Sequence, residues 1–173
     1  FINFSRFINS KLQQKHWRLL AILIGVGLAF FVTDRLARFG TLFGPRPIVI
    51  NNIEAPPLPT LDPTRVAQGA MLYAQQCASC HGVDLNGAPN WKESLADGSL
   101  PPPPHTSSGH TWHHKDELLI KLILNGGDPQ FKSKMPAFKD KLSEADGMAI
   151  LDFFKSKWGR QEREFQWWMT TVS

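Results

Sequence analysis

The longest apolar stretch of the chain, LLAILIGVGLAFFV, occupies residues 19–32 and has no polar face. Helices at the surface of a soluble domain keep one polar side, so this pattern is typical of a membrane span. Trp17 and Phe39 can lie at the two membrane interfaces, which extends the usable helix to residues 17–39. A cleaved signal peptide is the rival interpretation, but the residues that follow are bulky and charged where a peptidase needs small ones. We therefore expect a retained transmembrane anchor at 17–39.

Small residues recur every four positions in this stretch, at Ala21, Gly25 and Ala29. Residues at that spacing share one helix face, and their small side chains let two membrane helices approach closely. The same spacing also arises by chance in apolar runs. We expect these three residues to contact a helix of another membrane subunit.

Prolines dominate the next segment, GTLFGPRPIVINNIEAPPLPTLDP, at residues 40–63. Such a composition disfavours helix and favours the extended polyproline conformation. The segment has no alternation of apolar and polar residues long enough to indicate a strand. It is therefore predicted to be a semi-rigid spacer.

Helical periodicity returns after the spacer, at about residues 63–78, at 116–124 and from Ser143 onward. Ser143 and Asp146 have the spacing of a capping box, and Gly126 can supply a left-handed stop to the second helix. The positions expected to face inward are Val66, Ala70, Tyr73 and Ala74 in the first helix, Leu118, Leu119, Leu122 and Ile123 in the second, and Gly147, Ile150, Leu151, Phe154 and Trp158 in the third. The predicted fold class is therefore all-α.

A long segment without regular periodicity, residues 79–115, separates the first two of these helices. A structureless loop of that length is unusual in a compact domain unless something other than protein fills the space. A large apolar cofactor would do so.

Composition adds little, because 42% hydrophobic and 20% charged residues are ordinary for a globular protein. The net charge of +4 comes from basic residues around the apolar run and forms no dense patch, so we expect no nucleic-acid partner.

The only cysteines of the chain, Cys77 and Cys80, stand in the sequence CASCH, which His81 completes. C-x-x-C-H is the attachment signature of c-type haem: two thiols can form thioethers to the vinyl groups, and the histidine can bind the iron. Zinc is a rival, but it needs four ligands and the chain has no second cysteine pair. A redox disulfide is another, but its βαβ setting is absent. A haem is the working interpretation.

Three stretches, QGAMLYAQQCASCHG, KMPAF and AILDFFKSKW, resemble the class I cytochrome c family over residues 64–159. The resemblance implies one covalently bound haem c inside an all-α shell, with thioethers at Cys77 and Cys80 and with His81 on the iron. It also implies that the first and last helices cross at Gly69, Tyr73 and Phe153, and that a proline carbonyl from the run Pro101–Pro104 holds the haem histidine.

The same resemblance matches Met135 of the MPAF stretch to the sixth iron ligand, and a thioether in that position raises the reduction potential. Four histidines compete for that position, although capping of the second helix or contact with a haem propionate is the preferred role of His113 and His114. The indole N–H of Trp112 is a candidate donor to a propionate, as is that of Trp91, with ordinary packing as the alternative. The competing histidines are His105, His110, His113 and His114.

Two axial ligands leave the iron no site for a substrate, so the expected function is one-electron transfer rather than catalysis by this chain alone. An alternative is a haem enzyme or gas sensor with an open iron, in which His110 or His113 would act on the distal side. A further alternative is an assembly subunit whose haem is vestigial. Since c-type haem is attached outside the bacterial cytoplasmic membrane, the resemblance places residues 1–16 in the cytoplasm and the haem domain on the periplasmic side.

Two surfaces are candidates for partners. Lys132, Lys134, Lys139 and Lys141 flank Met135 and could steer an acidic redox partner, or could simply be solvated. The aromatic tail at residues 160–173 is predicted to be a docking strap, with a membrane contact or disorder as alternatives. Together with the anchor in the lipid bilayer, these features resemble the monohaem cytochrome subunit of a bacterial quinol-oxidising assembly such as alternative complex III. A mobile membrane-tethered shuttle is the rival.

Overall fold

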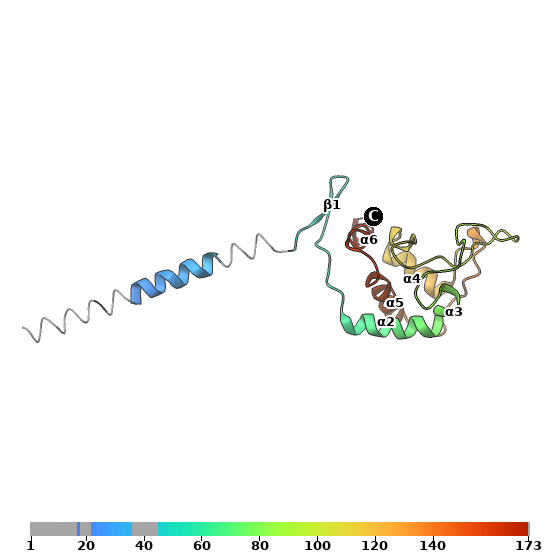
Figure 1. Ribbon diagram of the computed structural model, residues 1–173, viewed down its shortest axis with the longest axis horizontal. Coiled ribbons are helices and arrows are strands. Elements are labelled where there is room, and N and C mark those ends of the chain that lie inside the picture. Colours follow the sequence, from blue (N-terminus) through green and yellow to red (C-terminus); the bar gives the residue numbers. More distant parts are fainter. Residues whose placement is uncertain (1–16, 18–21, 36–44, 173) are drawn as a thin grey trace, which may run out of the picture. The chain divides into compact units, whose positions relative to one another are not determined.

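The computed structural model describes residues 17, 22–35 and 45–172, and contacts within the chain divide it into two units, Phe1–Pro45 and Arg46–Ser173 (Figure 1). In the first unit, residues 22–35 are helical and exposed. Within the described part of the chain, no helix combines the length and the apolar character that a membrane crossing requires. The predicted cytoplasmic segment 1–16 and Ala21 lie outside the described residues, as does part of the predicted anchor.

The second unit is built on two crossed helices, α2 (Pro63–Gln76) and α5 (Glu144–Lys155). Gly69 lies at the crossing, where an added Cβ would overlap the carbonyl oxygen of Ala149. The ring of Tyr73 lies 5.5 Å from that of Phe153 between centroids. The predicted crossing at Gly69, Tyr73 and Phe153 is therefore confirmed.

The remaining helices of this unit are shorter or lie at its ends. Their bounds are α3 (Ala78–His81), α4 (Asp116–Asn125) and α6 (Arg160–Val172), with 3-10 turns η1 (Thr111–His113) and η2 (Pro129–Phe131). α4 packs against α5. The predicted all-α domain is thus helical as expected, with one small sheet in addition.

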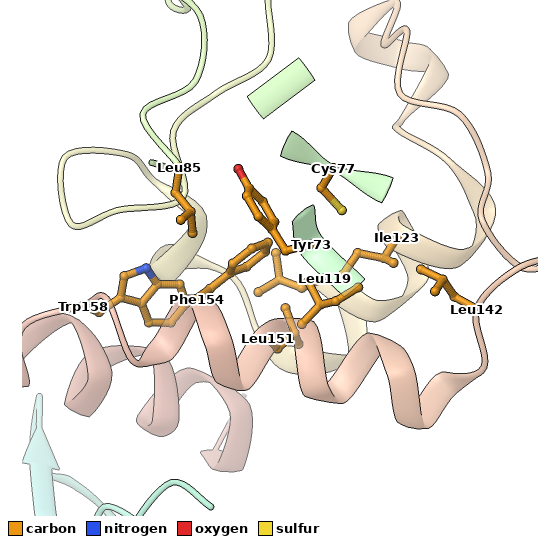
Figure 2. Packing of buried hydrophobic residues seen from close by; sticks show 10 residues of the cluster. Tyr73, Cys77, Leu85, Leu119, Ile123, Leu142, Leu151, Phe154 and Trp158 are labelled. Atoms are coloured by element: carbon orange, nitrogen blue, oxygen red, sulfur yellow. The ribbon is translucent and has the colours of Figure 1, made fainter. Parts of the chain in front are cut away.

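Most predicted inward positions form one core. Figure 2 shows its side chains as a layer that extends from Trp158 past Phe154 and Leu151 to Leu142. All five inward positions predicted for α5 and its flank are buried. Ala74 and Leu118, by contrast, are exposed, so those two predictions are wrong. Each is adjacent in sequence to a buried residue. Because successive residues of a helix are about 100° apart around its axis, each side chain lies outside the apolar face that packs on the core.

The helix ends follow the predicted chemistry. The hydroxyl of Ser143 accepts from the backbone of Asp146, and the Asp146 carboxylate accepts from the backbone N–H of Ser143, so the capping box is confirmed. α4 ends at Gly126, whose φ of +91° suits only glycine.

The predicted spacer at 40–63 is wrong in part, because its described residues include a β-hairpin. β1 (Ile48–Ile50) and β2 (Ile53–Ala55) pair antiparallel with Ile48 opposite Ala55. Asn51 and Asn52 form the turn, both with positive φ, as a tight hairpin of right-handed twist requires. Ile48 and Ala55 are buried, and both strands contact α6.

The tail at 160–173, predicted to be a docking strap, includes α6, which packs on the hairpin and on η1 of the same chain. Trp167 Nε1 donates to the carbonyl of Pro56 and Trp168 Nε1 to that of Ile53, both at 3.0 Å. The aromatic residues therefore bind the linker of the same chain, and the folded unit extends beyond residue 159. In Figure 1 the hairpin and α6 lie together, away from α3.

Candidate haem-binding site

The CASCH motif lies where α2 gives way to α3. Cys77 is both the C-cap residue of α2 and the N-cap residue of α3. The N–H of His81 donates to the carbonyl of Cys77 at 3.0 Å. Cys77 is buried against the core and Cys80 is exposed, and neither forms a disulfide. This single helical turn brings both thiols and the imidazole into one neighbourhood.

The environment of Cys77 disfavours the rival thiol chemistries. Burial, and secondarily the neighbouring Cys80, raises the pKa of Cys77 to about 11. A free thiol with that pKa stays protonated at neutral pH, which makes it a poor nucleophile for disulfide exchange. Among the described residues, no group of three or more His, Cys, Asp and Glu side chains is arranged to hold a cation.

His81 has the state that an iron ligand needs. Its side chain is buried, and its Nδ1 donates to the carbonyl of Pro103 at 2.9 Å. Burial lowers the pKa of His81, while the bond to Pro103 opposes that shift, so the ring is neutral at pH 7. Since Nδ1 carries the hydrogen, Nε2 presents its lone pair, and it has no hydrogen-bond partner among the described residues. The residues therefore fit a haem iron held at Nε2.

The structure identifies Pro103 as the proline that holds His81, within the predicted run of four. The run is enclosed by close backbone contacts: a Cβ on Gly87 would lie 2.6 Å from the carbonyl carbon of Pro103. Gly87 also has a φ of +67°. The N–H of Ala88 donates to Pro102 at 2.8 Å. The carbonyl that orients His81 is thus fixed by its own surroundings.

His105 lies directly behind His81. The two ring centroids are 4.3 Å apart, and His105 stacks on Phe154 at the same separation. Two imidazoles on opposite sides of an iron, each bonded at about 2 Å, would have ring centres about 6 Å apart. His105 is therefore too close to His81 to be the ligand on the other side, and that alternative is wrong for this residue. Burial, then the proximity of His81 and His110, lowers the pKa of His105.

The other three histidines form an aromatic group with two tryptophans. His110 stacks on Trp91 at 5.3 Å and meets His114 edge-on at 5.4 Å. His113 lies 3.8 Å from Trp112 between ring centroids. Nδ1 of His110 is buried and has no hydrogen-bond partner among the described residues.

The predicted helix-capping role of His113 and His114 is wrong. α4 has Lys115 as its N-cap, with no side-chain bond, and the first N–H of the helix donates instead to the hydroxyl of Thr170 in α6 at 3.2 Å.

The indole of Trp112 donates to the carbonyl of Ser107 at 3.3 Å. This donor therefore has an acceptor within the chain, and its contact with a propionate stays a prediction.

Met135 lies in the loop between η2 and α5, partly buried against the same core cluster as Cys77. Its carbonyl accepts from the N–H of Gly127 at 3.0 Å, and its own N–H donates to Ser133 at 3.3 Å. These bonds fold the loop back on the end of α4. Its role as iron ligand stays a prediction, as does that of His81.

Two of the predicted docking lysines have partners in the chain. Lys134 forms an ion pair with Asp97 at 2.9 Å, and Lys132 donates to the Asp97 carbonyl at 3.3 Å. The hydroxyl and N–H of Ser99, and then Lys134, lower the pKa of Asp97. The loop that carries Asp97 is thereby joined to the loop that carries Met135, a link that sequence spacing alone could not reveal.

A separate groove of about 490 Å³ lies between β1, Trp112 and the start of α6. None of the haem-motif residues lines it.

The family model described as "Cytochrome C oxidase, cbb3-type, subunit III" matches residues 64–154, which include the CASCH motif and Met135. No solved structure matches the chain significantly. Because the match covers more than half of the chain, the protein belongs to this cbb3-type subunit III family of c-type cytochromes, which bind haem c and transfer electrons.

Proposed function

We propose that this protein is a membrane-anchored one-electron carrier with a single haem c, attached covalently through Cys77 and Cys80 and ligated by His81 and Met135. One observation carries the proposal: a buried, neutral His81 is oriented by Pro103 so that Nε2 alone remains to bind iron. When bound, the haem supplies an iron that accepts and returns one electron. Every other contribution comes from the chain.

The chain would act on the iron in two ways. His81 and the soft thioether of Met135 would occupy both axial positions, which excludes a substrate and favours the reduced state. The apolar cluster around Cys77 would keep water from the site, and a dry site disfavours the more highly charged oxidised iron. Both effects favour a stable, relatively high-potential carrier.

The membrane placement is a proposal supported by sequence. The apolar run at residues 19–32 and its aromatic flanks support an anchor at 17–39, with residues 1–16 cytoplasmic and the haem unit periplasmic. Ala21, Gly25 and Ala29 would face a helix of another subunit in the bilayer.

We further propose that the chain works as a subunit of a respiratory or photosynthetic complex that passes electrons from quinol oxidation towards a periplasmic acceptor or terminal oxidase. The name of its family refers to a cytochrome oxidase subunit. A quinol-oxidising assembly such as alternative complex III is the other placement. The docking of residues 53–59 on α6 supports a subunit over a mobile shuttle, because a linker bound to the domain cannot lengthen its tether.

The test begins with haem content and ligation in the purified full-length protein. We expect one haem per chain that resists extraction by acidified solvent, and a weak near-infrared sulfur-to-iron band in the oxidised protein. Met135→Ala should abolish that band and allow reduced protein to bind carbon monoxide rapidly. The matched control is Met71→Ala, an exposed methionine of α2, which should change neither property. A Met135→Ala protein that keeps the band would refute the ligand assignment.

A further inference from the structure

We propose that His105 is a positioning residue for the iron ligand, and that its ring fixes the plane in which the His81 imidazole lies. The inference rests on the proposed function, because it takes His81 to bind a haem iron. It adds a role for a histidine that the cytochrome motifs do not include.

The first argument is the stacking. The His105 ring packs against two others: His81, at 4.3 Å and 31° between planes, and Phe154, at 4.3 Å and 16°. Phe154 belongs to α5 and is buried. His81 therefore rests on a flat support that is itself backed by the main helix crossing. A ligand ring in contact with a flat partner cannot rotate freely about its χ2 bond without losing that contact.

The second argument is that the backbone of His105 is fixed at both of its polar atoms. Its N–H donates to the carbonyl of Leu85 at 2.8 Å. Its carbonyl accepts from the indole of Trp158, also at 2.8 Å. Leu85 and Trp158 are both buried core residues. The backbone of His105 is thus held by Leu85, in the loop that follows CASCH, and by Trp158, which follows α5 in the chain.

The third argument concerns the ring itself. Its Nδ1 lies 2.9 Å from the hydroxyl of Thr111, which in turn lies 3.3 Å from the carbonyl of Pro104. A carbonyl can only accept, so the Thr111 hydroxyl donates to Pro104 and accepts from Nδ1 of His105. The chain of two bonds fixes the tautomer and the rotation of the His105 ring. A phenylalanine could supply the flat face, but only a residue with this donor is also locked to the loop.

Of three consecutive residues, two contact His81 directly and the third acts through Thr111. Pro103 binds Nδ1 of His81, the carbonyl of Pro104 anchors Thr111, and His105 supports the His81 ring face. Partners of this outer kind orient a metal-bound histidine and tune the metal. The orientation of the imidazole plane determines how its orbitals overlap those of the iron, so paramagnetic resonance of the oxidised haem reports it directly.

The experiment compares four variants of the haem-loaded full-length protein by electron paramagnetic resonance of the ferric state. The wild type should give one narrow set of low-spin g values. His105→Leu keeps much of the volume but loses the flat face, and should give a broadened or second set. His105→Phe keeps the face but loses the bond to Thr111, and should broaden the set less than His105→Leu does. Thr111→Val removes the lock on the ring and should broaden the set. Met71→Ala changes an exposed residue of α2 and should match the wild type.

Wild-type g values in His105→Leu would overturn the proposal, as would equal broadening in the leucine and phenylalanine variants. Where His105→Leu does not accumulate, an unchanged spectrum in Thr111→Val would overturn it. These failures differ from failure of the proposed function, which would appear as a wild-type protein that holds no haem, or that shows no sulfur-to-iron band. The reduction potential is a second readout, and it should shift in His105→Leu more than in His105→Phe.

Discussion

The Lys155 ammonium lies 2.7 Å from Oδ2 of Asp116, and both side chains are buried. The second carboxylate oxygen, Oδ1, accepts from the side-chain amide of Gln166 at 2.6 Å. Helices α4, α5 and α6 thus meet at one carboxylate. The C-terminal helix is therefore joined to the cytochrome core by a buried polar network and is an integral part of the folded unit.

Removing one side chain of this network should destabilise the folded protein. Asp116→Ala would leave the Lys155 charge buried without a counter-ion, and we expect the free energy of unfolding to fall by about 3–5 kcal/mol. Equilibrium urea unfolding of the haem-loaded protein measures this change. Lys157→Met removes an exposed lysine from the same stretch and serves as control, with an expected change close to zero. A loss in Asp116→Ala no larger than in the control would contradict the network.

The helix crossing makes opposite predictions for two glycines. Gly69→Ala would drive its Cβ into the backbone of Ala149, so α2 and α5 must separate, and we expect a loss of about 1–3 kcal/mol. Gly147→Ala, in α5, would place its Cβ 3.7 Å from Ile120, an ordinary contact. That variant should be more stable by about 0.5–1 kcal/mol, because alanine favours helix. Thermal unfolding of the two variants, side by side, distinguishes a tight crossing from a general intolerance of side chains.

Acid should lower the free energy of unfolding through His110 and His114, which precede α4 in the chain. Burial, then neighbouring histidines, lowers the pKa values of His110 and His114 below 6.5 in the folded protein. The unfolded chain then binds more protons than the folded chain as the pH falls below about 6.5, so stability is full above that pH and declines below it. Urea midpoints measured between pH 8 and pH 5 should therefore decrease. His110→Gln should show a smaller decrease, and an identical profile would refute the assignment.

The sequence predicted best where local chemistry and periodicity agree. Ser143 and Asp146 form a cap that is legible in four residues, and α5 places its apolar residues at helical spacing. CASCH is contiguous, so its turn could be predicted without long-range information. Gly69 and Tyr73 could be assigned to the crossing only through the resemblance to class I cytochromes, since spacing alone does not identify the helix that they meet.

The missed elements lacked that signal. Each strand of the hairpin has three residues, too few to show alternation, although the pair Asn51 and Asn52 is a recognisable turn signal. α6 was missed because its most buried residue is the polar Gln166, which hydrophobic periodicity does not detect. The position of His105 depends on Thr111, Phe154 and Trp158, which only the folded chain brings together.

The lysines around Met135 allow a test that separates partner docking from loop structure. Charge reversal at Lys132 and Lys134 should slow electron transfer to an acidic partner at low ionic strength, and the difference should shrink as salt screens the charges. Both lysines also contact Asp97, so reversal would break the link between the two loops. Asp97→Asn removes the carboxylate charge and leaves both lysines, and it is the matched control.

Stopped-flow oxidation of the haem by an acidic acceptor, at several ionic strengths, decides between these roles. If the lysines steer the partner, Asp97→Asn should be as fast as the wild type or faster, because it removes a negative charge beside them. If they act only by holding the loop of Met135, Asp97→Asn should instead weaken the sulfur-to-iron band and slow transfer at every ionic strength. Equal rates for wild type and reversed variant at all salt concentrations would contradict docking at this surface, and Lys139 and Lys141 would then be the next residues to reverse.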